Sequence, residues 1–264
     1  EFSSRAHVPS LDAYRELCRQ AEEHPEEFFS GLAEKELSWF KKWDHPFEWN
    51  PPFVKWFVGG TLNASYNCVD RHVEAGNGSK VALHWVGEPG DTRDVTYAEL
   101  QVMVSRFANM LKARGLKPGD RAIIYMPMVP EAVAAMLGCA RLGVTHSVVF
   151  GGFSAEALKA RIQDLEASAV ITADGGWRRG KALNLKGAVD EAIAAECPSV
   201  HTVIVLKRTN TEITMAEGRD VWWHDLDSTV TDDCPPEHLD AEHPLYVLYT
   251  SGTTGKPKGI LHTT

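Results

Sequence analysis

The stretch that decides the fold runs from residue 121 to residue 150 and reads RAIIYMPMVPEAVAAMLGCARLGVTHSVVF. It opens with a short apolar run, Arg121–Met126, and closes with another, Thr145–Phe150. Between the two, apolar residues at helical spacing begin near Pro130 and stop at Gly143. A buried strand, a helix and a second buried strand in this order predict a βαβ unit with parallel strands.

The same alternation extends in both directions from this unit. Further Val- and Ile-rich runs, typical of buried strands, occupy Lys80–Val86, Ala169–Thr172, Thr202–Leu206 and Leu245–Tyr249. Helical patterns lie between them, at 96–115 with a capping box of Thr96 and Glu99, at 154–167 and at about 185–196. We therefore expect an α/β fold, with a mainly parallel sheet flanked by helices and ligands gathered beyond the carboxyl ends of the strands.

Two regions depart from this alternation. Residues 28–57 hold ten of the chain's 24 aromatic residues, and prolines interrupt the helical pattern there. We expect an irregular, aromatic-rich arm over residues 1–78 that docks its rings, followed by an α/β body over residues 79–264. The acidic segment 209–240 is expected to be a surface excursion before the last strand.

Composition excludes several classes of function. The 27 Lys and Arg residues against 36 Asp and Glu give a net charge of −9, which argues against nucleic-acid binding. The sequence contains no run of 18 apolar residues, so no membrane span is predicted, and the start of the chain lacks a signal-peptide core. Five cysteines without CxxC spacing indicate reduced thiols and a cytoplasmic location. The 11 histidines show no metal-ligand spacing, so no metal site is predicted.

A candidate phosphate loop follows the last predicted strand and reads TSGTTGKPKG, residues 250–259. Its glycines let the backbone fold around a polyanion, its amides and hydroxyls can donate to phosphate oxygens, and Lys256 and Lys258 add positive charge. The loop is not a Walker A sequence, because Pro257 follows Lys256 where that pattern has a hydroxyl residue. An ordinary polar surface loop is the alternative.

A second basic segment, Arg178-Arg179-Gly180-Lys181 with Lys186 beyond it, follows the strand predicted at 169–172. It could hold an anion at the carboxyl edge of the sheet, since arginine offers paired donors to phosphate. A solvated turn is the alternative. The triplet Asp70-Arg71-His72 is interpreted as a surface ion pair or a helix start rather than a catalytic group.

The string from Tyr249 to Gly259 resembles the signature loop of the adenylate-forming superfamily. Within that superfamily the chain resembles the acetyl-CoA synthetases most, from about residue 10 to its last residue. The segments that carry this resemblance are 56–63, 67–72, 149–154 and 262–264. Thr253 stands where many of these enzymes have Ser, which keeps the hydroxyl.

The resemblance implies the N-terminal part of the large domain of an enzyme that joins a short-chain acid to ATP and then transfers the acyl group to coenzyme A (CoA). The implied ATP-binding residues are Thr250, Ser251, Gly252, Thr253, Thr254, Gly255, Lys256 and Lys258. Lys256 and Lys258 would stabilise phosphate charge during catalysis. The implied CoA-binding residues are Phe150, Gly151, Gly152, Arg178, Arg179, Gly180 and Lys181. Mg²⁺ would accompany ATP, but we find no ligands for it in the chain.

Alternatives remain open from the sequence. A propionyl-CoA or other short-chain acyl-CoA ligase would share these motifs, and a non-catalytic nucleotide- or CoA-binding module would share part of them. A dinucleotide-dependent dehydrogenase is disfavoured, because no GxGxxG follows the early strands. In the family, the acyl pocket and the C-terminal domain lie beyond the position of Thr264. We therefore expect the 264 residues alone to form no acyl-adenylate.

Overall fold

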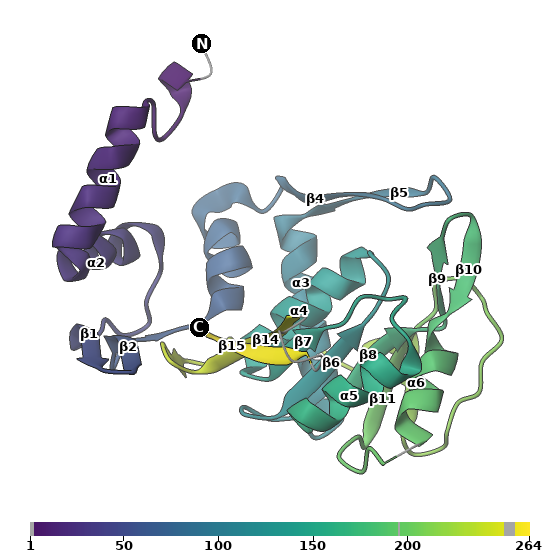
Figure 1. Ribbon diagram of the computed structural model, residues 1–264. Helices are drawn as coiled ribbons and strands as arrows, with labels where there is room; N and C mark the ends of the chain where they lie inside the picture. The colour runs from purple at the N-terminus through teal and green to yellow at the C-terminus, as the bar shows by residue number, and fades with distance from the viewer. Residues whose placement is uncertain (1–2, 195, 251–256) are drawn as a thin grey trace. The chain divides into compact units, whose positions relative to one another are not determined.

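A computed structural model describes residues 3–194, 196–250 and 257–264, and its contacts divide the chain into two compact units (Figure 1). Unit 1 comprises Glu1–Leu62 and Asp240–Glu242, and unit 2 comprises Asn63–Leu239 and His243–Thr264. Residues 63–78 thus share their contacts with the α/β body. The domain boundary at residue 78 stays a prediction.

Unit 1 is regular, which corrects the expectation of an irregular arm. Its elements are η1 (Ser3–Arg5), α1 (Leu11–Glu23), α2 (Pro25–Glu36), the antiparallel pair β1 (His45–Asn50) and β2 (Phe53–Val58), and β3 (Thr61–Leu62). The Ser10 hydroxyl caps α1, and Pro25 starts α2 at the position where a missing N–H costs nothing. Proline therefore separates two helices here instead of preventing them.

The aromatic residues of unit 1 pack chiefly against one another. The ring centroids of Trp39 and Trp43 are 4.8 Å apart, and those of Trp43 and Phe57 are also 4.8 Å apart. Trp49 and Phe53 are exposed. This cluster gives the small unit an apolar centre of its own.

The central sheet of unit 2 confirms the predicted mainly parallel architecture. Its described strands run in the order β12-β11-β8-β6-β7-β14-β15, with β15 antiparallel and each other neighbouring pair parallel. The strands are β6 (Arg121–Tyr125), β7 (Thr145–Val148), β8 (Ala169–Ala173), β11 (Thr202–Leu206), β12 (Asp220–Trp222), β14 (Pro244–Thr250) and β15 (Lys258–Thr263). Strands β6, β8 and β11 are buried on both faces, which agrees with their largely apolar runs.

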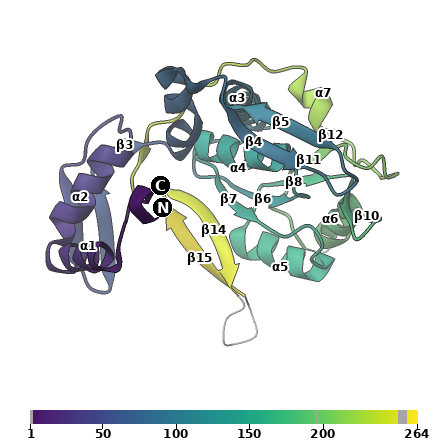
Figure 2. The same ribbon diagram turned by 90° about the horizontal axis from the view of Figure 1, so that it is seen from above.

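Helices cover both faces of this sheet (Figure 2). On one face α3 (Tyr97–Ala113), α4 (Pro130–Leu142) and α7 (Trp223–Asp227) bury a core that includes Phe107 and Ile124. On the other face α5 (Ala155–Leu165) and α6 (Leu185–Ala194) bury a second core that includes Ile123 and Leu158. Among the helices that the structure describes, none has the length and apolar composition needed to cross a membrane.

The helix boundaries confirm the capping signals in the sequence. Thr96 and Glu99 form both hydrogen bonds of a capping box at the start of α3. Gly143 ends α4 in the left-handed region, with φ of 75°. Short helical turns, η2 (Tyr66–Asp70) and η3 (Val73–Asn77), precede the first strand of the unit.

Two predictions about strands were wrong. The run predicted at 80–86 forms β4 (Val81–Val86), but it pairs antiparallel with β5 (Thr92–Thr96) in a separate two-stranded ribbon. The segment 209–240 is more than a surface excursion, because it supplies the edge strand β12, the helix α7 and the short strand β13 (Leu239–Asp240). Neither an apolar run nor an acidic composition reveals which strand a segment pairs with.

The interpretation of Asp70 as part of a surface ion pair was also wrong. Its carboxylate is buried and accepts two hydrogen bonds from Arg141 of α4, at 2.7 and 2.9 Å. Gln101 of α3 donates a third, at 2.9 Å. These contacts of Asp70 therefore join η2 to α3 and α4.

His146 of β7 provides a pH-dependent test of this packing. Its side chain is 6% exposed, and burial lowers the pKa of its imidazole from the ordinary 6.5 to about 4. Because the unfolded chain then binds the proton more tightly, the contribution of His146 to stability is retained above pH 6.5 and lost as the pH falls toward 4.

We expect the contribution of His146 to the free energy of unfolding to fall by about 2 kcal/mol between about pH 7.5 and about pH 5. The variant His146→Gln should lack that part of the pH dependence of the free energy of unfolding, measured by urea titration. His201→Gln is the matched control at an exposed position. An identical pH dependence in His146→Gln and the unmodified chain would show that His146 titrates normally.

Candidate active site

A pocket of about 600 Å³ opens at the carboxyl edge of the parallel sheet. Its floor consists of the segments that follow three adjacent strands: Met126–Val129 after β6, Val148–Gly151 at the end of β7 and Gly176–Arg178 beyond β8. The chain leaves β6 toward one face of the sheet and leaves β7 and β8 toward the other. A crevice at such a switch point is where open α/β sheets bind ligands.

Two of the predicted site segments meet in this pocket. The guanidinium carbon of Arg178, in β9 (Gly175–Arg178), lies 5.0 Å from the centroid of the Phe150 ring. Gly152 has φ of +143°, and a Cβ there would lie 2.5 Å from Nη1 of Arg178. A Cβ on Gly151 would lie 2.8 Å from the Met126 carbonyl oxygen. Glycine at 152 therefore permits the close approach of Arg178, and glycine at 151 permits that of the loop after β6.

Tyr125, at the end of β6, holds the Phe150–Phe153 turn in place. Its hydroxyl donates to the Phe153 carbonyl at 2.8 Å and accepts from the Gly152 N–H at 3.2 Å. The Phe153 N–H closes the turn on the Phe150 carbonyl at 3.0 Å. Burial raises the pKa of Tyr125, so the phenol remains a donor at neutral pH.

The rest of the basic segment forms the tip of a hairpin between β9 and β10 (Lys181–Asn184). Arg179 and Gly180 make the turn with φ of 52° and 74°, both in the left-handed region. All four residues from Arg178 to Lys181 are exposed, and Arg178 alone of the four lines the pocket. The hairpin thus directs Arg178 inward and leaves the other two cations at its outer end.

Lys186 does not belong to this basic surface, which corrects the sequence interpretation. Its ammonium is buried and pairs with Asp190 at 2.6 Å and Asp220 at 2.8 Å. It also donates to the Thr214 carbonyl at 2.9 Å. With these donors engaged, Lys186 stabilises the packing of α6 against β12 and is not available to an external anion.

The predicted phosphate loop lies only partly within the described residues. Thr250 ends β14 and pairs with Lys258, the first residue of β15, so the loop connects two antiparallel strands. Both residues are exposed. Ser251, Gly252, Thr253, Thr254, Gly255 and Lys256 lie outside the described residues. Leu248 lines the pocket, which places the start of the loop two residues beyond the pocket wall.

Sequence reasoning missed the other wall of the pocket. The β4–β5 ribbon contributes Trp85–Glu88, and Arg208 follows β11. The position of Arg208 was a usable signal, because it stands just after a buried parallel strand in the same way as Arg178. Trp85 gave no such signal, because the apolar run around it was interpreted as a strand of the central sheet.

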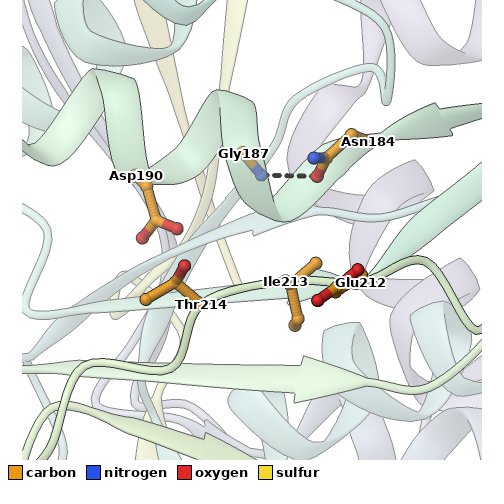
Figure 3. Close-up of a pocket in the computed structure, with 6 residues that line it drawn as sticks. All are labelled: Asn184, Gly187, Asp190, Glu212, Ile213 and Thr214. Atoms are coloured by element: carbon orange, nitrogen blue, oxygen red, sulfur yellow. Dashed lines mark hydrogen bonds between the residues drawn. The ribbon is translucent and has the colours of Figure 1, made fainter.

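A second cavity, of about 370 Å³, lies beside α6 (Figure 3). It is lined by Asn184, Gly187, Asp190, Glu212, Ile213 and Thr214. The Asn184 side chain accepts from the Gly187 N–H at 2.7 Å, and Asp190 is engaged by Lys186. The carboxylates of Asp190 and Glu212 make this cavity unfavourable for a phosphate.

Within the described part of the chain, no group of three or more His, Cys, Asp or Glu side chains could hold a metal ion.

Comparison with known proteins gives two family matches. Residues 69–264 match the family described as AMP-binding enzyme, and residues 14–68 match the acetyl-coenzyme A synthetase N-terminus. The chain is 54% identical over 263 residues to an acetyl-coenzyme A synthetase of Chlorobaculum tepidum, covering 100% of this chain and 40% of that protein. It is 58% identical over 230 residues to the enzyme of the same name from Streptomyces avermitilis, covering 87% and 35%. The chain therefore spans at most about 40% of the length of these curated relatives.

The Tyr125 hydroxyl gives a test of how the turn is held. Tyr125→Phe removes one donor and one acceptor and leaves the Phe153 carbonyl and the Gly152 N–H without this partner. We expect the free energy of unfolding to fall by about 1–2 kcal/mol. The control, Tyr66→Phe, removes an exposed hydrogen bond to Glu74 and should cost less than about 0.5 kcal/mol. Equal effects of the two substitutions would contradict the positioning role.

Proposed function

The chain belongs to the AMP-binding enzyme family, and from this premise we propose that it forms the N-terminal part of an AMP-forming acetyl-CoA synthetase. In the proposed reaction, acetate displaces pyrophosphate from ATP to give acetyl-adenylate. The thiol of CoA then takes the acetyl group and releases AMP. The observation that carries the proposal is the 54% identity to the Chlorobaculum enzyme along the whole chain, supported by the match to the acetyl-coenzyme A synthetase N-terminus.

The first step requires charge stabilisation rather than a base. A small carboxylic acid has an ordinary pKa near 4 and is already ionised at neutral pH. The charge to be stabilised is that of the departing pyrophosphate. We assign this task to the loop Thr250–Lys258, whose hydroxyls and amides would donate to the β and γ phosphates while Lys256 and Lys258 supply positive charge.

Mg²⁺ is part of the proposal only as the companion of ATP. Mg²⁺ is commonly held by substrate phosphates and waters with one or two carboxylates. Because the described residues offer no cluster of three candidate ligands, we assign it no ligand in this chain.

For the second step we propose that the pocket at the sheet edge receives the nucleotide part of CoA. Phe150, Gly151 and Gly152 offer an aromatic face and a closely approachable backbone, and Arg178 offers paired donors to a phosphate. Arg179, Gly180 and Lys181 at the exposed hairpin tip would add weaker contacts. A volume of about 600 Å³ falls in the range of small-molecule sites.

The proposal includes small-molecule substrates only and a cytoplasmic location. The net charge of −9 supports the absence of a nucleic-acid partner. The odd number of cysteines without paired spacing supports a reducing compartment.

The reaction is tested with the protein encoded by the complete reading frame. We expect exchange of labelled pyrophosphate into ATP that depends on acetate, and a higher kcat/KM with acetate than with propionate. Exchange without any added carboxylate would contradict the proposed activity. A preference for propionate would keep the adenylate chemistry and change the substrate.

The assignment of the CoA pocket predicts that Arg178→Gln separates the two half-reactions. Loss of one charge-assisted contact should raise the KM for CoA by about tenfold or more. The acetate-dependent pyrophosphate exchange, which needs no CoA, should stay within about twofold of the unmodified enzyme. Arg19→Gln on the exposed face of α1 is the control. If Arg178→Gln lowers both half-reactions equally, the guanidinium is not specific to the CoA step.

A further inference from the structure

The β4–β5 ribbon (Val81–Thr96) forms a wall of the pocket without belonging to the central sheet. A two-stranded ribbon alone is marginally stable, so its position depends on the contacts it makes. Trp85 donates its indole N–H to the Met128 carbonyl at 2.7 Å, and Glu88 accepts from the Gly180 N–H at 2.5 Å. These two contacts join the ribbon to the loop after β6 and to the basic hairpin.

A tie between the ribbon and the end of β11 is made by Arg208. Its two terminal nitrogens bind the Asp91 carboxylate at 2.8 and 3.0 Å. Its guanidinium carbon lies 5.0 Å from the centroid of the Trp85 ring, so the same side chain contacts β4 and the turn that leads into β5. The Arg208 side chain is 19% exposed and that of Asp91 is 41% exposed, so solvent partly screens the pair, and its two parallel contacts matter chiefly because they define its geometry.

The fit around this pair is close. A Cβ on Gly87 would lie 2.1 Å from Oδ1 of Asp91 and 2.7 Å from Nη2 of Arg208. Only glycine therefore leaves room for the pair at that place. At its other end, the main-chain N–H of Arg208 donates to the buried Asp174 carboxylate at 2.7 Å. Arg208 thus connects the ribbon to a fixed point at the carboxyl edge of the sheet.

We propose that Arg208 and Asp91 are positioning residues that fix the β4–β5 ribbon as the second wall of the CoA pocket. The inference rests on the proposed function for the identity of the ligand. The paired contacts to Asp91 and the contact with the Trp85 ring orient the guanidinium toward the ribbon, so we assign it to holding the ribbon in place rather than to binding the ligand. Loosening the pair widens the pocket, and CoA binding weakens while the adenylation step, which uses no CoA, is retained.

The test uses the full-length enzyme with Arg208→Gln, Asp91→Asn and the double variant. Each single change should raise the KM for CoA by roughly three- to tenfold. The double variant should be no worse than the more severe single variant, because both changes remove the same pair. The acetate-dependent pyrophosphate exchange should stay within about twofold of the unmodified enzyme in all three.

A matched ion pair outside the pocket serves as the control. Arg106 of α3 pairs with Asp227 of α7 at 2.8 Å, and Arg106→Gln should leave the KM for CoA unchanged.

If Asp91→Asn lowers the KM for CoA while Arg208→Gln raises it, Arg208 contacts the ligand directly and the positioning role is overturned. Equal losses in both half-reactions, with a lower free energy of unfolding, would also overturn it. If the unmodified full-length enzyme shows no acetate-dependent pyrophosphate exchange, the proposed function itself is contradicted. Unchanged KM values in an active enzyme refute this inference alone.

Discussion

The buried carboxylate of Asp174, just after the end of β8, joins the start of the β9–β10 hairpin to the loop that follows β11. It accepts the main-chain N–H groups of Gly175 and Arg208 at 2.7 Å each, of Thr209 at 3.0 Å and of Thr211 at 3.1 Å. The N–H groups of a loop that follows a parallel strand have no neighbouring strand to bond, and burying them without an acceptor costs about 1–3 kcal/mol each. One carboxylate, with about four acceptor positions, meets that requirement for these four N–H groups.

From this anchor the two walls of the pocket diverge. On one side the hairpin begins at Gly175 and carries Arg178 to the ring of Phe150. On the other side Arg208 extends to Asp91 and Trp85 in the β4–β5 ribbon. The parallel sheet supplies the floor, because its strand order places the ends of β6, β7 and β8 next to one another. The geometry of the pocket therefore follows from the strand order together with the main-chain N–H groups that the Asp174 carboxylate holds.

The features that the sequence predicted are those with local signals. Local signals, each within a few positions, predicted the capping box at Thr96, the end of α4 at Gly143 and the apolar strands. Because ligands bind at the carboxyl ends of parallel strands, the sequence also predicted that Phe150 and Arg178 lie at the same edge of the sheet. The features it could not predict depend on partners far along the chain. A lysine in a basic run does not reveal that Asp220 neutralises it, so Lys186 was misassigned. Likewise the partner of β4 and the role of Arg208 follow from tertiary contacts that no short pattern encodes.

The central claim is that CoA binds at the carboxyl edge of the sheet, between the hairpin and the ribbon. Hydrogen–deuterium exchange of the full-length protein, with and without saturating CoA, tests it without any substitution. The account predicts slower exchange in the segments that border this pocket, at 126–129, 148–153, 175–181 and 85–88. Protection confined to the cavity beside α6, at 184–190 and 212–214, or no protection in any of the pocket segments, would contradict it.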